Sequence, residues 1–182
     1  MHCFKGDYPY ICSNKYMRSM RRVEFVPVKL SDVAEIFSVR IDNKEYTELQ
    51  EFIITIRDVK EKHLHNDYEQ ILKSLAEISD KGAREYFFRP EGKMNDRVCA
   101  IPLLTSYRQK QKGTLRLYCI RISDKLLITG GGGIKTTRTY NEDDTLANHV
   151  KTLHMIDEKL RLLEQDGCNL PKEIYNLKLE ID

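Results

Sequence analysis

The chain has 182 residues, with 30 Lys or Arg against 28 Asp or Glu and a formal net charge of +2, a length that predicts one domain with additions at its ends. No apolar run reaches the ~18 residues that a membrane span requires, and the first twenty residues lack the order of a secretory signal, so we expect a cytoplasmic protein with no membrane contact. Five scattered cysteines without a C-x-x-C pair argue against a disulfide framework and a structural zinc site, and we expect no metal and no cofactor.

The N-terminal part of the chain begins without periodicity and then alternates. Residues 1–19 are expected to be a tail, residues 20–167 the single domain, and residues 168–182 a C-terminal tail or short strand. Residues 23–30 and 35–41 alternate apolar and polar side chains, which predicts an N-terminal β-hairpin. Pro27 favours an edge strand there, because proline cannot donate to a neighbouring strand.

Residues 42–82 change to the spacing of a helix. Asp42 or Asn43 is a candidate cap, and apolar residues at i, i+3 and i+4 continue to Gly82, where a helix would stop. The pattern allows one bent helix or a helical hairpin, and the polar stretch 60–67 is the expected turn.

From residue 85 the period becomes two again, and a long helical pattern follows. Four strands are expected, in residues 85–89, 96–104, 113–122 and 125–130. Asp143 or Asp144 is expected to cap a long helix that ends at Gly167. The sequence thus predicts an α+β fold: an antiparallel or mixed sheet of about four strands, a helical hairpin on one face, a C-terminal helix and the N-terminal β-hairpin, with the helices segregated to one side of the sheet.

The charge is unevenly distributed along the chain. Residues 84–140 contain 12 Lys or Arg and 4 acids, a balance of +8, so the remainder carries −6. This asymmetry indicates a basic middle segment that meets a polyanion on an acidic helical scaffold. The alternative is that strand edges and loops collect cations to stay soluble.

Four consecutive glycines, Gly130–Gly133, follow an apolar strand. A phosphate-binding P-loop needs glycine directly before its lysine and a helix after it, whereas Ile134 precedes Lys135 and the β-branched residues 136–140 follow. The remaining explanation is a strand that ends in a sharp bend and presents basic side chains to a ligand. The polar side chains that follow the glycines and could contact such a ligand are those of Lys135, Thr137, Arg138 and Tyr140.

Arg116 is the most unusual residue of the preceding strand. Strand alternation places it on one face with Thr114 and Tyr118. An arginine in an apolar central strand is costly unless that face is open to solvent or to an anion. The alternative is a salt bridge to an acid on a packed helix.

Residues 114–140 resemble the RelE/HigB branch of the RelE/ParE toxin superfamily, including phage-derived Gp49-like proteins. The matching residues are Arg116, Leu117 and Tyr118, then the glycine run and Lys135, with Arg138 and Tyr140 beyond. The order of predicted elements extends the resemblance over about residues 45–165. Thr136 departs from it, because many relatives carry a second Lys or Arg there.

The resemblance implies a toxin that is neutralised by a cognate antitoxin protein and that cuts mRNA, in association with the ribosome, without a metal. In that chemistry a 2′-hydroxyl attacks the adjacent phosphate. Arg116 would stabilise the phosphate with help from Lys135 and Arg138. No histidine lies between residues 84 and 140, so the general base would be Lys135, Tyr140 or a residue of another segment. Tyr140 could equally stack on a base or pack. The residues implied for RNA-backbone binding are Arg89, Lys93, Arg108, Lys110 and Lys112.

Two further readings belong to other functional classes: a ParE-like inhibitor of a topoisomerase, or a catalytically inactive binding module of the same fold. Neither would cut RNA. The histidine pairs at 63 and 65 and at 149 and 154 lack i, i+4 spacing, so we expect solvated helix residues and not metal ligands.

Overall fold

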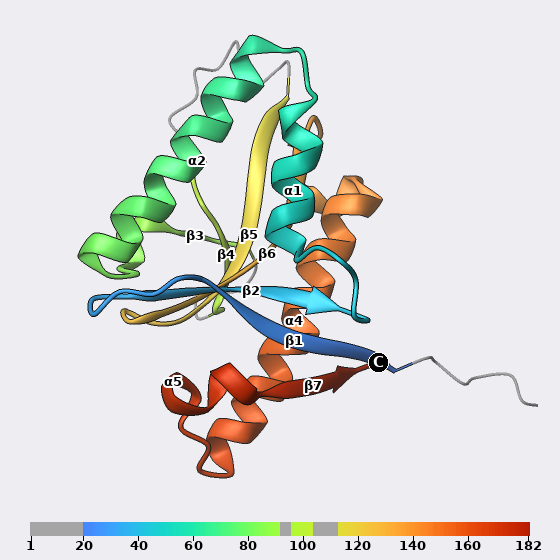
Figure 1. The fold of residues 1–182 in the computed structure, drawn as a ribbon. Helices are drawn as coiled ribbons and strands as arrows, with labels where there is room; N and C mark the ends of the chain where they lie inside the picture. Colours follow the sequence, from blue (N-terminus) through green and yellow to red (C-terminus); the bar gives the residue numbers. More distant parts are fainter. Residues whose placement is uncertain (1–19, 92–95, 104–112) are drawn as a thin grey trace, which may run out of the picture.

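A computed structural model describes residues 20–91, 96–103 and 113–182. The expected N-terminal tail (1–19) and the candidate RNA-binding residues Lys93, Arg108, Lys110 and Lys112 lie outside these described residues. The chain folds as α+β around one curled, mixed sheet (Figure 1). The sheet is larger than the four strands expected, because both ends of the chain add strands to it.

The described sheet has seven strands in the order β3-β4-β5-β6-β2-β1-β7. The strands are β1 (Arg21–Lys29), β2 (Glu35–Ile41), β3 (Arg89–Pro90), β4 (Val98–Ala100), β5 (Thr114–Ser123), β6 (Leu126–Lys135) and β7 (Lys178–Ile181). All neighbouring pairs are antiparallel except β2 and β6, which run parallel. The N-terminal hairpin is confirmed as β1 and β2, but the parallel β2–β6 pair makes it part of the main sheet.

The C-terminal segment forms the short strand that was one of the two expectations. β7 pairs with Arg21–Glu24 of β1. Pro27 lies outside the stretch of β1 that pairs with β7, so its missing N–H does not cost a hydrogen bond between these two strands. The register between β1 and β2 shifts between Pro27 and Lys29.

Residues 48–81 form a helical hairpin, which rules out a single bent helix. Helix α1 is Glu48–Arg57 and helix α2 is Lys62–Lys81, so the turn is shorter than expected. Thr47 caps α1 in a capping box with Gln50. Asp42 and Asn43 do not cap it; both adopt φ of 54° in the turn after β2.

The expectation that the helices lie on one side of the sheet is wrong. Helices α1 and α2 cover one face, whereas α4 (Asp144–Gln165) and α5 (Leu170–Glu173) cover the other (Figure 1). Along β5, Leu117 and Cys119 pack with α1 and α2, and Tyr118 and Ile120 pack with α4. A strand with both faces buried reads as a continuous apolar run, so its sequence does not reveal how many helical layers cover it.

The strand predictions for residues 85–104 were too long. Residues Glu85–Phe87 form a 3-10 turn, and β3 and β4 are short. By contrast, β6 is longer than expected because it continues through Gly130–Gly133 to Lys135. The glycines therefore do not bend the chain out of the sheet.

Close packing explains the glycine run. A Cβ on Gly132 would lie 2.0 Å from the Arg116 carbonyl oxygen, and one on Gly131 would lie 2.3 Å from His149 Nδ1. A Cβ on Gly130 would lie 2.8 Å from Leu153 Cδ2. The β5–β6 register also shifts between Leu117 and Cys119, where β6 carries one extra residue as a β-bulge. Side chains at these positions would push α4 and β5 away.

Candidate functional site

Arg116 lies in the middle of β5, half-buried, opposite Gly133 of β6. Its Nη1 donates to the Leu115 carbonyl oxygen at 2.9 Å. Among the described residues, no carboxylate lies within ion-pair distance of its guanidinium. Arg121, further along the same strand, differs: it is paired with Asp124 at 2.5 Å and with Glu85 at 3.8 Å. Asp67 of α2, which accepts from the Leu115 backbone N–H at 3.0 Å, and Glu91 lie within electrostatic reach of Arg116 without forming an ion pair with it.

Lys135 ends β6, and its register partner on β5 is Thr114. Its Nζ donates to the carbonyl oxygens of Thr137 at 2.8 Å and Arg138 at 2.6 Å. Burial lowers the pKa of Lys135, and the positive charges of Arg116 and Arg89 lower it further, against the opposing influence of Glu91 and Glu142. Lys135 therefore lies within electrostatic reach of both Arg116 and Arg89.

Glu91 is a member of this site that the sequence analysis missed. Its backbone N–H donates to the Val98 carbonyl oxygen at 3.2 Å, which holds it beside β4. Burial raises the pKa of its carboxyl, while Arg89, Arg116 and Lys135 act to lower it. The signal in the sequence was an acid inside the basic stretch 89–93, but only the pairing of β3 with β4 places that acid near β5.

Two tyrosines complete the site. Tyr118 is fully buried, and its hydroxyl has no hydrogen-bond partner among the described residues. Tyr140 is half-buried and meets it edge-on, with ring centroids 6.3 Å apart. Burial raises the pKa of Tyr118, and Glu91 raises it further. Together, Arg89, Glu91, Arg116, Tyr118, Lys135 and Tyr140 are called the Arg116 cluster below.

Within the part of the chain that the structure describes, no contact of the Arg138 guanidinium brings it into the Arg116 cluster. Its side chain is exposed, and only its carbonyl oxygen is joined to Lys135. Arg89 is also exposed, but it lies on β3 opposite Ala100, which is itself opposite Tyr118 on β5. Cross-strand partners share a face of the sheet, so Arg89 projects from the same face as Arg116.

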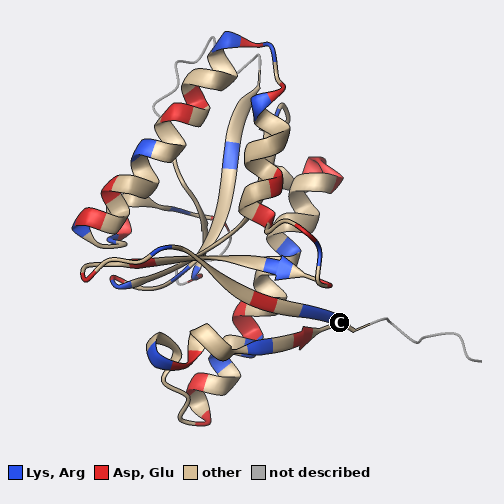
Figure 2. Ribbon diagram, viewed as in Figure 1, with Lys and Arg blue, Asp and Glu red and all other residues tan. Residues whose placement is uncertain are grey.

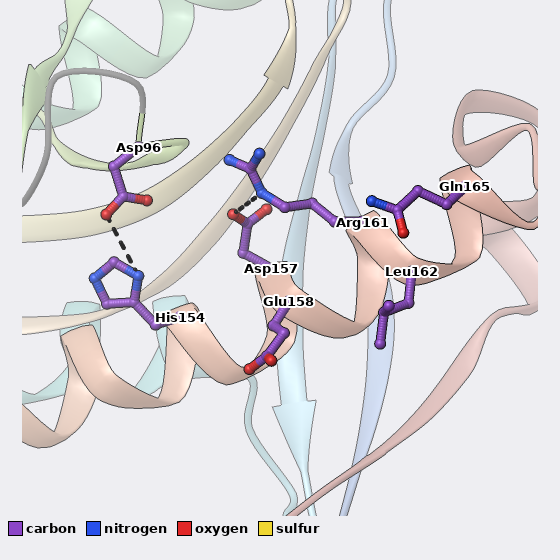
Figure 3. A pocket seen from close by; sticks show the side chains of 7 residues that line it. All are labelled: Asp96, His154, Asp157, Glu158, Arg161, Leu162 and Gln165. Atoms are coloured by element: carbon purple, nitrogen blue, oxygen red, sulfur yellow. Dashed lines mark hydrogen bonds and ion pairs between the residues drawn. The ribbon is translucent and has the colours of Figure 1, made fainter.

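Outside the basic stretch 84–140, Asp and Glu recur along α1, α2 and α4 as well as in strands and turns (Figure 2). Those of α4 help to line a pocket of about 540 Å³ (Figure 3). Its Asp157 is buried and lies 2.6 Å from Arg97 and 2.8 Å from Arg161, and His154 lies 3.5 Å from Asp96. Through these contacts Asp157, Arg97, Arg161, His154 and Asp96 tie α4 to the segment directly before β4.

The described residues contain no group of three or more His, Cys, Asp or Glu that could hold a metal ion. None of the described helices is long and apolar enough to cross a membrane. No family model matches the chain, and no curated protein or solved structure matches it either.

Proposed function

We propose that the Arg116 cluster binds the phosphate backbone of RNA and that the protein is an endoribonuclease toxin, directed at mRNA on the ribosome and held inactive by a cognate antitoxin. The observation that carries this proposal is the Arg116 guanidinium, which has no carboxylate partner among the described residues and lies near a second cation, Lys135. Arginine binds two phosphate oxygens at once through its planar fork.

The described topology adds support for the resemblance to the RelE/HigB proteins. Two helices (α1 and α2), a three-strand meander (β4 to β6) and a helix (α4) follow one another in the order that the resemblance implies. The strands β2, β1 and β7 extend this arrangement at one edge. They are additions to the sheet on the side away from Arg89.

The chemistry of the Arg116 cluster suits RNA cleavage without a metal. In the proposed reaction the 2′-hydroxyl oxygen attacks the adjacent phosphorus, its proton passes to the Glu91 carboxylate, and the bond from phosphorus to the 5′-oxygen breaks. Lys135 gives a proton to that 5′-oxygen, so the products are a 2′,3′-cyclic phosphate and a 5′-hydroxyl. A raised pKa makes Glu91 a better base, and a lowered pKa makes Lys135 a better acid.

Arg116 would stabilise the negative charge that builds on the phosphate oxygens. Arg89 would hold the neighbouring phosphate from the exposed edge of the sheet. Tyr140 would offer a ring for stacking against a base.

Purified protein incubated with ribosomes and mRNA tests the proposal. We expect position-specific cleavage, and a loss of about 10²–10³-fold in its rate for Arg116→Ala, the range seen when one donor to a developing oxyanion is removed. Arg57→Ala is the matched control, because Arg57 is exposed at the end of α1. Intact mRNA together with altered DNA supercoiling would instead support inhibition of a topoisomerase.

A further inference from the structure

One edge of β6 is open over its second half. On one side β6 pairs with β5 as far as Lys135, but on the other side β2 pairs only with Leu126–Thr129. No other described strand pairs with the open edge of residues 130–135, and α1 packs there instead. The backbone carbonyl groups along an open strand edge are strong acceptors that need partners.

A cavity of about 360 Å³ lies at this open edge, between α1, β6 and the first turns of α4. Its apolar body includes the side chains of Phe52 and Leu146. Gly132 and Gly133 contribute backbone without side chains, so β6 does not fill the space. The cavity is lined in the manner of a ligand site, with an apolar body and a few polar groups.

The ionisable residues lining this cavity are three carboxylates and one imidazole: Glu48, Glu51, Asp143 and His149. Asp143 is engaged as the N-cap of α4, and Glu48 Oε2 lies 3.4 Å from His149 Nδ1, so Glu51 and the other Glu48 oxygen are the acceptors that face an ammonium. No Lys or Arg is among the described residues that line it. Glu48 is only 7% exposed, so its charge acts in a medium of low dielectric constant. Lys44 lies beside the lining, with its Nζ 3.4 Å from Glu48 Oε1 and 3.2 Å from Glu51 Oε2.

We propose that this cavity binds a small molecule carrying a primary ammonium group on an apolar body. The ammonium would take the place that the Lys44 ammonium now holds beside Glu48 and Glu51, and the apolar body would lie against Phe52. An aromatic ring adds attraction for a cation within about 6 Å of its centre. The carbonyl groups of the open β6 edge would accept the remaining hydrogen bonds. This site is separate from the proposed RNA chemistry, and its test does not use RNA cleavage.

The protein is titrated with benzylamine, which is protonated at pH 7, or with its neutral analogue benzyl alcohol, and the backbone amide signals are monitored by NMR. We expect benzylamine to shift the Gly132 and Gly133 signals saturably, and benzyl alcohol to bind at least about tenfold more weakly, because charge-assisted hydrogen bonds are lost. Equal binding of the two compounds, or shifts confined to other parts of the chain, would overturn the proposal.

Two substitutions in the full chain are expected to change the affinity for benzylamine in opposite directions. Glu48→Gln removes the buried charge and should weaken benzylamine binding, whereas Lys44→Met removes the internal competitor and should tighten it. Glu69→Gln, an exposed acid of α2, makes the same change in net charge as Glu48→Gln and should leave binding unchanged. If Glu48→Gln proves too unstable, Lys44→Met still decides, since unchanged or weaker binding in that variant contradicts the proposal.

Discussion

Glu48 of α1 and His149 of α4 meet across the open edge of β6, with 3.4 Å between Glu48 Oε2 and His149 Nδ1. The helices that contribute them cover opposite faces of the sheet, and they meet here because β2 does not continue along β6. The imidazole lies against Gly131, where a Cβ would come within 2.3 Å of Nδ1. This contact joins the two helical layers directly.

The Glu48 carboxyl makes the free energy of unfolding depend on pH in the acidic range. Burial acts to raise its pKa, but His149 and Lys44 outweigh burial, so the pKa is lowered below the ordinary 4.5. A lowered pKa in the folded state gives stability that is present above the unfolded value and is lost as the pH falls through the folded value. Urea unfolding between pH 3 and 7 should show this loss, and Glu48→Gln should flatten it. An unchanged slope in that variant would mean that other carboxyls cause the acid sensitivity.

Alanine substitutions at different positions of the glycine run should destabilise the protein by different amounts. Gly132→Ala brings a Cβ within 2.0 Å of the Arg116 carbonyl oxygen, a backbone atom that cannot rotate away. Overpacking typically costs about 1–3 kcal/mol, and we expect this substitution to reach or exceed the upper end. Gly133→Ala is the matched control, since its Cβ meets only Leu146 Cδ2 at 3.2 Å. Thermal unfolding of the two variants should separate them clearly; equal losses would contradict the packing explanation.

Removing the Tyr118 hydroxyl should stabilise the protein. This hydroxyl is buried and has no hydrogen-bond partner among the described residues. An unsatisfied buried polar group costs about 1–3 kcal/mol, so Tyr118→Phe should raise the free energy of unfolding by a part of that amount. Urea titration measures it, with Tyr140→Phe as the control at a half-buried ring. A loss of stability in Tyr118→Phe would reveal a bound partner for the hydroxyl.

Asp157 should be among the least replaceable residues of α4. Its carboxylate accepts from Arg97 Nε at 2.6 Å and from Arg161 Nε at 2.8 Å, with only 5% of the side chain exposed. Removing one member of a buried ion pair leaves the other charge without compensation, so we expect Asp157→Ala to cost about 3–5 kcal/mol in unfolding free energy. Asp166→Ala, exposed at the end of the same helix, should cost much less. A double-mutant cycle with Arg97→Ala would show strong coupling, and additive losses would contradict it.

The proposed RNA cleavage should have a characteristic pH profile. The active form has Glu91 ionised and Lys135 protonated, so the rate should rise through the pKa of Glu91, which is above the ordinary 4.5, and fall through that of Lys135, which is below the ordinary 10.5. Measuring kcat/KM against pH for wild type and Glu91→Gln checks the assignment. Glu91→Gln should abolish the acidic limb. If that limb persisted, the base would be another residue.

The sequence predicts the local elements of this fold well. The apolar period of two identifies the β1–β2 hairpin and the β5–β6 pair, and the period of 3.6 identifies α1, α2 and α4, with Asp143 capping α4 as one of the two expected candidates. These signals come from neighbours in the chain, where propensity and burial act together.

The non-local features could not be predicted. The parallel pairing of β2 with β6, the addition of β7 and the second helical layer all depend on segments far apart in the sequence. The same limit applies to the Arg116 cluster: Arg116, Lys135, Arg138 and Tyr140 were expected together, but the Arg138 side chain is exposed outside the cluster, and Glu91 reaches it only because β3 pairs with β4. The Glu48–His149 pair joins residues about 100 positions apart, with no shared motif to indicate it.

The parallel β2–β6 pair also has a consequence for how the chain folds. It joins Ser38 to Thr129, so about 90 residues must be ordered or looped out before this pair forms. During synthesis the N-terminal hairpin and the helical hairpin emerge long before β6 exists. The edge of β2 stays unpaired through that interval, and the outer edge of β1 stays unpaired until β7 is made, so both edges of the hairpin are open to wrong strand pairing in a growing chain.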